Sequence, residues 1–165
     1  MTAPPTIINL LDVPLEREKA GSRFEASTSI LGVQLGLFGL GATLHEVPPG
    51  KTASPFHRHH TSDEMFLVLS GTGIYRYGEA RIPIKEWDCL GAPAGGEGHQ
   101  IINTGDVPLR YLGVSNNTNA DVVEYPDTGR IHVDVGATGH HRENATFSAG
   151  GRLVPLGYWE GEKID

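Results

Sequence analysis

Cysteine is nearly absent from this sequence: Cys89 is the single one among 165 residues, so no internal disulfide can form. That usage is typical of a reducing compartment, and we expect the protein to be cytoplasmic. Residues 1–5 contain neither the basic segment nor the apolar run of a signal peptide. No stretch is long and apolar enough for a membrane span. A disulfide scaffold and a membrane protein are therefore not expected.

Positive charge is also scarce. The chain has 13 Lys and Arg residues against 20 Asp and Glu residues, a formal net charge of -7. This balance argues against nucleic acid or an anionic membrane as the partner, and no helix-turn-helix segment is recognisable. The remaining expectation is a small-molecule substrate or ligand.

Glycine and proline, by contrast, are plentiful, with 22 and 11 residues. Frequent turns between short apolar segments favour an all-β chain, and the length suits one domain. We divide the chain into an N-terminal arm (1–29), a barrel (30–127) and an irregular C-terminal wrapping segment (128–165). Within the arm, Leu15–Lys19 is interpreted as a helical turn.

Alternating apolar residues predict the strands of the barrel. Residues 32–47 alternate with a change of phase at Gly39, which predicts a β-bulge. The further strand candidates are 56–60, 64–69, 73–77, 81–84, 88–92, 99–103 and 109–115. Two hairpin turns are expected, at Gly78-Glu79 and at Gly105-Asp106. The segment Asp121–Asp127 is expected to form an edge strand that ends at Pro126.

The most informative stretch is 50–71, which contains three potential metal ligands. His57 and His59 are two residues apart and so share one face of a strand. Thr61–Asp63 are turn formers, after which an apolar strand begins. If the chain reverses there, Glu64 opens the returning strand beside the two imidazoles.

A fourth candidate ligand follows in the segment 88–103. Its glycines and Pro93 predict a tight loop, and His99 begins the alternating segment after it. Three imidazoles and one carboxylate form a plausible site for a divalent transition metal such as Mn, Fe, Ni or Zn. The candidate ligands are His57, His59, Glu64 and His99.

These spacings resemble the two motifs of the cupin superfamily. The first resemblance is Gly50, six residues, His57-x-His59, four residues, Glu64, six residues and Gly71. The second is Pro93-x-Gly95, three residues, His99, three residues and Asn103. Asp88 stands at the usual aspartate, Trp87 replaces a glycine, and the gap from Gly95 to His99 is one residue longer than the commonest form. The resemblance covers roughly 30–116 and implies a double-stranded β-helix, a jelly-roll barrel, with the four residues above as metal ligands.

The flanks also resemble small bacterial cupins, some of which are labelled sugar-phosphate isomerase-like. The similarity lies in Asp121–Asp127, with its Tyr-Pro-Asp. Cupin-type glucose-6-phosphate isomerases tend to have a Thr-x-Gly run before the His-x-His, whereas Ser54-Pro55-Phe56 stands here. Single-barrel cupins commonly dimerise, and the run Met65–Leu69 is apolar on both faces. A homodimer is therefore expected.

Several other side chains compete for a role in the site. Asp63 is the rival carboxylate, but its turn position favours Glu64 as the ligand. Arg58 and His60 fall on the opposite strand face from the ligands. Cys89 is interpreted as an inert, buried thiol. The three histidines of the C-terminal segment, His132, His140 and His141, are interpreted as solvated.

Two classes of function fit these residues. The first is a metal-dependent enzyme acting on a small oxygenated molecule, with isomerisation of a sugar or sugar phosphate as one version and Fe(II)-dependent oxygenation as another. A phosphate would need cations, for which Arg76, Arg81 and Arg110 are the candidates. The second class is a metal-assisted small-ligand binding module without turnover. No catalytic residue is assigned.

Overall fold

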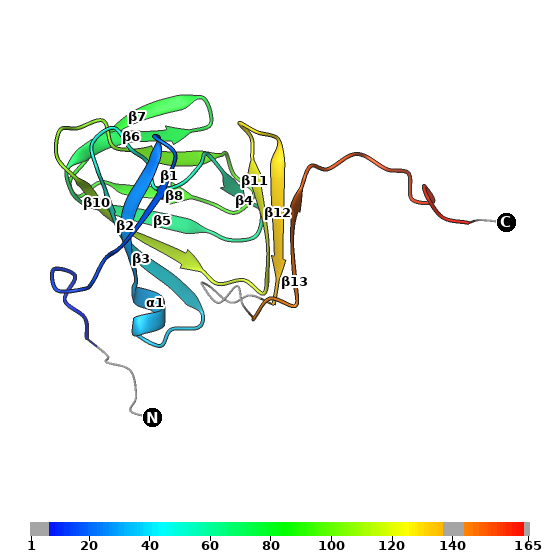
Figure 1. Cartoon of the computed structure of the whole chain (residues 1–165), viewed down its shortest axis with the longest axis horizontal. Helices are drawn as coiled ribbons and strands as arrows, with labels where there is room; N and C mark the ends of the chain where they lie inside the picture. The colour runs from blue at the N-terminus through cyan, green and yellow to red at the C-terminus, as the bar shows by residue number, and fades with distance from the viewer. Residues whose placement is uncertain (1–6, 137–143, 164–165) are drawn as a thin grey trace.

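The computed structural model describes residues 7–136 and 144–163. Over those residues the protein consists of thirteen strands and one short helix (Figure 1). In chain order these are β1 (Glu16–Ala20), β2 (Phe24–Ile30), α1 (Leu31–Gln34), β3 (Leu40–Val47), β4 (Arg58–His59), β5 (Glu64–Ser70), β6 (Thr72–Tyr77), β7 (Ala80–Lys85), β8 (Cys89–Ala92), β9 (His99–Ile102), β10 (Leu109–Asn116), β11 (Ala120–Tyr125), β12 (Arg130–Val135) and β13 (Phe147–Gly151).

Two antiparallel sheets share one apolar core. Their strand orders are β1-β2-β3-β10-β5-β8 and β7-β6-β9. The core contains Val68 and Tyr111 from the larger sheet together with Tyr75, Ile84 and Ile101 from the smaller one. Sheets that pack on each other in this way form a jelly-roll barrel, so the expected all-β, double-stranded β-helix fold is confirmed.

The core follows from the alternation that predicted the strands. In β10, Leu109, Tyr111 and Gly113 are buried, whereas the residues between them are only half-buried. Leu109, Val47 and Val68 are fully buried, and each such side chain contributes about 1.5–3 kcal/mol to folding. The strands observed in the barrel match the candidates from 64–69 to 109–115 to within one or two residues.

A third sheet covers one end of the barrel, in the order β13-β12-β11-β4. Within it β11 pairs with β4, so that Val123 lies opposite His59 and Glu124 lies opposite Arg58. The prediction of a strand near Asp121–Asp127 is right, but its edge position is wrong because β12 covers the other side of β11. That covering strand comes from the segment predicted to be irregular.

The N-terminal region likewise contains strands. The predicted helical turn at Leu15–Lys19 is wrong, since β1 begins at Glu16 and forms an antiparallel ladder with β2. Strand β2 then pairs with β3, so both strands extend the larger sheet. The division at residues 29 and 127 stays a prediction, although both flanks contribute strands.

The predicted β-bulge at Gly39 is also wrong. The helix α1 and a turn occupy the residues before β3, and Gly36 in that turn has a positive φ of 71°. The backbone N–H of Leu35 donates to the carbonyl of Leu31, which closes the helical turn. The change of phase in the sequence therefore reflects a break between two elements rather than a bulge within one strand.

One of the two predicted hairpin turns is present. Strands β6 and β7 pair up to Tyr77 opposite Ala80, with Gly78 in the turn at a φ of 55°. The hairpin at Gly105-Asp106 is wrong, because β9 and β10 belong to different sheets. The side chain of Asn103 is fully buried and donates to the carbonyls of Val47 and Val107. These two hydrogen bonds hold the connection that passes from β9 in the smaller sheet to β10 in the larger one.

The expectation of a buried Cys89 is wrong as well. In β8 the inward positions belong to Leu90 and Ala92, so Cys89 faces solvent. No helix within the described ranges is long and apolar enough to cross a bilayer.

Candidate metal centre

The four predicted ligands come from three separate segments of the chain and meet at one end of the barrel. His57 precedes β4 and forms a β-bridge with His99, their backbone N–H groups donating to each other's carbonyls at 3.2 and 2.7 Å. His59 lies in β4, and Glu64 opens β5. As the sequence analysis placed it, Glu64 starts the strand after the turn at Thr61–Asp63, while β4 itself pairs with β11 and not with β5.

The ligand side chains converge on the Glu64 carboxylate. Its Oε2 lies 2.9 Å from the Nε2 of His99, 3.3 Å from that of His59 and 3.9 Å from that of His57. The potential ligand atoms of His57, Glu64 and His99 all lie within 4.8 Å of one another. His59 stands just outside this group of three and faces the same carboxylate oxygen. The structure thus brings all four candidates together.

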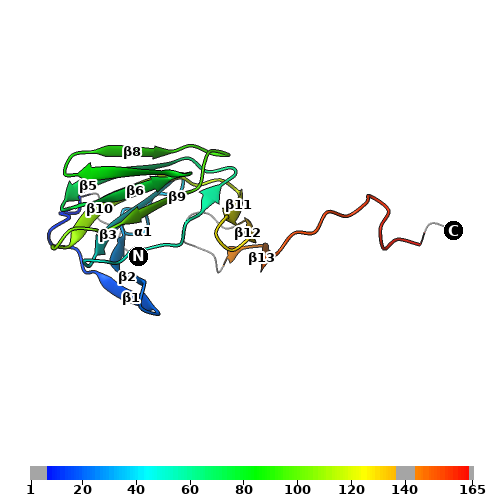
Figure 2. The ribbon, with the colours of Figure 1, turned by 90° about the horizontal axis from the view of Figure 1, so that it is seen from above.

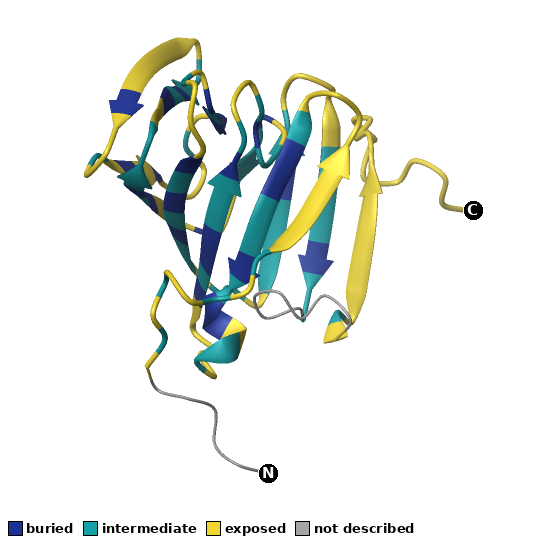
Figure 3. Ribbon diagram, turned by 60° about the vertical axis from the view of Figure 1, so that its left-hand side comes forward, coloured by how far each residue is buried: buried dark blue, intermediate teal, exposed yellow. Residues whose placement is uncertain are grey.

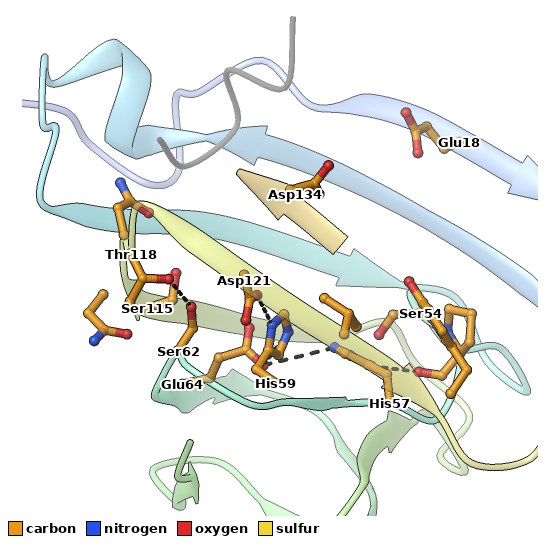
Figure 4. A pocket seen from close by; sticks show the side chains of 15 residues that line it. Glu18, Ser54, His57, His59, Ser62, Glu64, Ser115, Thr118, Asp121 and Asp134 are labelled. Atoms are coloured by element: carbon orange, nitrogen blue, oxygen red, sulfur yellow. Dashed lines mark hydrogen bonds and ion pairs between the residues drawn. The ribbon is translucent and has the colours of Figure 1, made fainter. Parts of the chain in front are cut away.

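Hydrogen bonds orient two of the imidazoles. The Nδ1 of His57 lies 2.8 Å from the carbonyl oxygen of Pro55, and the Nδ1 of His59 lies 2.5 Å from Oδ2 of Asp121 (Figure 4). A carbonyl can only accept, so Nδ1 of His57 carries the proton and donates it. In neutral imidazoles bonded this way, Nε2 keeps its lone pair and faces the cluster.

The ionisation of the cluster suits a cation. Burial, followed by the neighbouring His99, lowers the pKa of His57 to about 4, so this imidazole is neutral at pH 7. Burial raises the pKa of Glu64, but His99 and His59 outweigh it and hold that pKa below its ordinary value. The site therefore presents a neutral His57 imidazole and a Glu64 carboxylate anion, the forms in which these groups bind metals.

Polar atoms in the cluster have no hydrogen-bond partners outside it. Within residues 7–136 and 144–163, Oε2 of Glu64 and Nε2 of His99 are buried and contact only other members of the cluster, at 2.9 Å from each other. Buried polar atoms that are poorly hydrogen-bonded cost free energy. A divalent transition metal bound by both atoms would satisfy them, so the residues present fit such an ion.

Asp121 was missed as a functional residue. Its pKa is raised by burial, but the His59 imidazole and the Thr61 hydroxyl lower it further than burial raises it, so the carboxylate is ionised. The signal was present in the alternation of β11, which places Asp121, Val123 and Tyr125 on one face. Without knowledge that β11 pairs with β4, nothing in the sequence connected that face with His59.

Two cavities flank the cluster. The larger, which we call the outer cavity, has a volume of about 550 Å³ and is lined by the oriented imidazole of His59. Its other lining groups are mostly carboxylates, amides and hydroxyls (Figure 4). They include Glu18, Ser54, Ser62, Ser115, Asn116, Asn117, Thr118, Asp121 and Asp134.

The smaller, inner cavity measures about 210 Å³ and lies within the barrel. Its walls include His99, Phe66 and Tyr111, together with His45, which the sequence analysis did not single out. The His45 ring stacks on Tyr111 with centroids 4.7 Å apart and an angle of 14°. His57 and Glu64 line both cavities, so the cluster stands between them.

The cationic side chains proposed for a phosphate do not line either cavity. Arg76 forms a two-pronged ion pair with Asp127, and its guanidinium lies 3.5 Å from the Phe56 ring centroid. Arg110 approaches Glu46 at 3.5 Å. Arg81 is exposed on β7. In the described part of the chain, no Lys or Arg lines the two cavities.

The competing residues have other partners. Asp63 is exposed and accepts a hydrogen bond from the backbone N–H of Ala94. His60 lies 3.1 Å from Glu124 and away from the cluster. His132 contacts Asp134 at 3.1 Å and is only half-buried, while His140 and His141 lie outside the described residues.

Known proteins resemble this chain over its barrel. Residues 43–115 match the family described as Cupin domain. An oxalate-binding protein of Thermotoga maritima is 33% identical over 69 residues, which are 42% of this chain and 55% of that protein. The match thus spans about half the length of the curated relative.

Two solved structures resemble most of the chain. A cupin-superfamily sugar phosphate isomerase from Silicibacter pomeroyi superposes with a TM-score of 0.74 at 24% identity, covering 92% of this chain and 97% of its own. A protein of Acidithiobacillus ferrooxidans, provisionally called a sugar phosphate isomerase, gives 0.75 at 22% identity with the same coverage. At such identities the likeness shows a shared fold. By the sequence match, with which this fold agrees, the chain carries a cupin domain at residues 43–115.

Proposed function

We propose that this protein is a metal-dependent cupin that binds a small, oxygen-rich and uncharged molecule, of which a free sugar undergoing isomerisation is the leading example. The metal would be held by His57, His59, Glu64 and His99. The observation that carries the proposal is the convergence of three imidazole Nε2 atoms on the Glu64 carboxylate, 2.9 to 3.9 Å away. A metal there supplies Lewis-acid polarisation of an oxygen of the bound molecule.

The chain's own residues prepare the site for that chemistry. The carbonyl of Pro55 and the carboxylate of Asp121 fix which nitrogen of His57 and His59 faces inward. Glu64 contributes the negative charge among the proposed ligands, which offsets the charge of the cation. The hydroxyls and amides of the outer cavity offer both donors and acceptors to a ligand rich in hydroxyl groups.

The charges of the outer cavity favour an uncharged ligand. Four carboxylates line it, those of Glu18, Glu64, Asp121 and Asp134. A divalent cation would offset two of these charges and leave the cavity negative. A phosphate or a dicarboxylate would then meet like charge without a described Lys or Arg to compensate it. This supports the unphosphorylated version of the sugar hypothesis. The polar lining also gives no support to the oxygenase version.

A second candidate is a binding module for a small dicarboxylate, without turnover. It is favoured by the relative named as an oxalate-binding protein, which matches the barrel region at 33% identity. In this version the two carboxylates of the ligand would bind the metal directly, and direct metal contact would have to outweigh the negative lining. The two candidates therefore differ in the charge of the preferred ligand, which is neutral in the first and negative in the second.

The test is a titration of metal-loaded protein, by calorimetry, with a free aldose, the corresponding sugar phosphate and oxalate. Metal content is measured first on freshly purified protein. Chelated protein and the His99→Ala variant serve as metal-free controls, and His60→Ala serves as a matched histidine control. Turnover is followed by proton NMR in D₂O, where isomerisation through proton transfer exchanges hydrogen at the carbon next to the carbonyl.

We expect stoichiometric metal, and binding of the free aldose only when metal is present. Preferential binding of oxalate without turnover of any sugar would support the binding module instead. Protein that retains no metal, or that binds every ligand equally with and without chelator, would overturn both versions.

A further inference from the structure

The C-terminal arm, residues 152–163, carries a dense group of exposed apolar side chains. It leaves β13 and extends away from the barrel (Figures 1 and 2). Tyr158 is 87% exposed and Trp159 is 63% exposed. The other exposed apolar residues of the arm are Leu153, Val154 and Leu156. A run of this kind in water is unfavourable, and large exposed apolar groups mark interaction sites.

Among the described residues of one copy, none covers the arm. Its hydrogen bonds in the described part are local, namely Gly157 with Glu160 and Glu162 with Trp159. The one ring contact of the arm joins Tyr158 to Trp159, with centroids 4.6 Å apart. No described hydrogen bond, ion pair or ring contact joins it to the barrel.

The strand that leads into the arm is also open on one side. β13 pairs with β12 and forms the outer edge of its sheet, and all five of its residues are exposed (Figure 3). An edge strand presents unpaired backbone groups that can pair with another chain. The arm and the strand before it thus form one continuous uncovered surface.

The barrel carries a second uncovered apolar group, which we call the α1 patch. It consists of Val33, Leu37, Phe38 and Leu40, all exposed, around the turn between α1 and β3. Phe38 is 76% exposed. The chain therefore contains an apolar arm and an apolar patch, and neither covers the other within one copy.

The direction of β13 shows how the arm of one copy could reach the α1 patch of another. It starts at the end of the molecule where α1 lies and runs toward the opposite end, from which the arm departs (Figures 1 and 3). If two copies pair their β13 edges antiparallel about a two-fold axis, the opposite ends of the copies come together. The departing arm of each copy then lies beside the end of its partner that carries the α1 patch.

We propose that two copies of this chain form a two-fold dimer by exchanging their C-terminal arms, each arm packing on the α1 patch of the other copy. The partner is a second copy because the two uncovered surfaces complement each other and lie in the same chain. An isologous contact of this kind covers both surfaces in both copies at once.

The apolar area and the charges are adequate for such a dimer. Each buried aromatic side chain removes about 150–250 Å² from water, so the two aromatics of two arms alone bury on the order of 600 Å² or more. The aliphatic residues and the patches raise the total above the roughly 1,000 Å² expected of a specific interface. Residues 153–159 carry no charge, so packing them costs no ion desolvation despite the net charge of -7.

The test is the molar mass in solution, by light scattering and sedimentation, of the full-length chain and its variants. We expect the parent to be a dimer at micromolar concentration. Trp159→Ala on the arm and Phe38→Asp on the patch should each raise the dimer dissociation constant by at least about 30-fold, the effect of removing a central aromatic anchor. A chain that ends after Gly151 should be monomeric.

Two controls separate arm exchange from other interfaces. Met65→Ser alters an exposed apolar residue on the outer face of β5, and Ile82→Ser alters one on β7. Both should leave the dimer intact. Circular dichroism and metal content verify that every variant is folded, so that loss of the dimer is not loss of the fold.

Complementation tests the exchange itself. The chain that ends after Gly151 keeps the patch, and the Phe38→Asp chain keeps the arm. Mixed together, they should form a heterodimer that neither forms alone, because one intact arm meets one intact patch. A monomeric parent, a dimer that survives arm removal, or a dimer broken by Met65→Ser but not by Trp159→Ala would overturn the proposal.

Discussion

The two cavities beside the candidate metal site differ in what they offer a ligand. The outer cavity, about 550 Å³, is lined by carboxylates, amides and hydroxyls, whereas the inner one, about 210 Å³, is walled by aromatic rings and lies within the barrel. His59 lines the outer cavity and His99 the inner one, while His57 and Glu64 line both.

The difference between the two cavities suggests separate roles for them in metal binding and in ligand choice. The inner side, with the Phe66 and Tyr111 rings in its wall, encloses the buried Nε2 of His99 and Oε2 of Glu64, which would bind a cation. The outer side supplies the polar groups that orient His59 and meet a ligand. We therefore expect metal binding to depend more on the inner side, and ligand choice more on the outer side.

The largest effect is expected at the inner ligand. His99→Ala should lower metal affinity by more than about 100-fold, because loss of even a partner behind a ligand costs 10–100-fold. Metal content after dialysis, measured by emission spectrometry, checks this. His60→Ala is the matched control and should retain metal. Full metal occupancy in His99→Ala would contradict the assignment of the ligand and the division between the two sides.

Acid should destabilise the chelated protein through His57, which lines both cavities. Its pKa is 6.5 unperturbed and about 4 in the folded protein, so between these values the unfolded chain binds more protons. The free energy of unfolding therefore falls as pH drops from about 6.5 to about 4, by up to about 3 kcal/mol. Below that range Glu64, whose pKa is lowered, adds a loss of the same sign.

Denaturant titrations of chelated protein between pH 7 and pH 4 measure this slope. The control is His57→Gln, which cannot titrate and should show a clearly flatter dependence. Equal slopes in parent and variant would mean that acid acts elsewhere in the molecule.

Removing the charge behind the outer ligand should have a smaller effect. Asp121→Asn keeps the size of the side chain but weakens its hydrogen bond with Nδ1 of His59. Metal affinity should therefore fall about tenfold. Asp127→Asn removes a carboxylate that pairs with Arg76, away from the cluster, and should leave affinity unchanged. Competition with a fluorescent chelator gives both affinities.

The smallest effect concerns ligand choice. Asp134→Asn, in the outer cavity, should shift the affinity ratio of oxalate to free aldose toward oxalate by about threefold, since one like charge is removed. Gly113→Ala narrows the inner cavity, where an added methyl would contact the Phe66 ring at 3.4 Å. It should leave that ratio unchanged. The opposite pattern would place the ligand in the inner cavity.

Local sequence patterns predicted the barrel strands well. The run 109–115 alternates between buried and half-buried residues because one face packs in the core, whereas 64–69 is a continuous apolar run; both patterns lie in neighbouring residues. The position of Glu64 relative to His57 and His59 was also accessible, because two linked spacings resemble a known motif. These features depend on residues that are close in the sequence.

The pairing of distant strands was not accessible in this way. The sequence alone determined that strands form, that His57, His59, Glu64 and His99 are suitable ligands, and that a thiol framework is absent. Only the tertiary structure decided that β4 pairs with β11, which brings Asp121 to His59, and that Arg76 turns to Asp127 rather than to a ligand. The physical reason is that strand pairing depends on the free energy of contacts between distant segments, which a local pattern of apolar and polar residues does not contain.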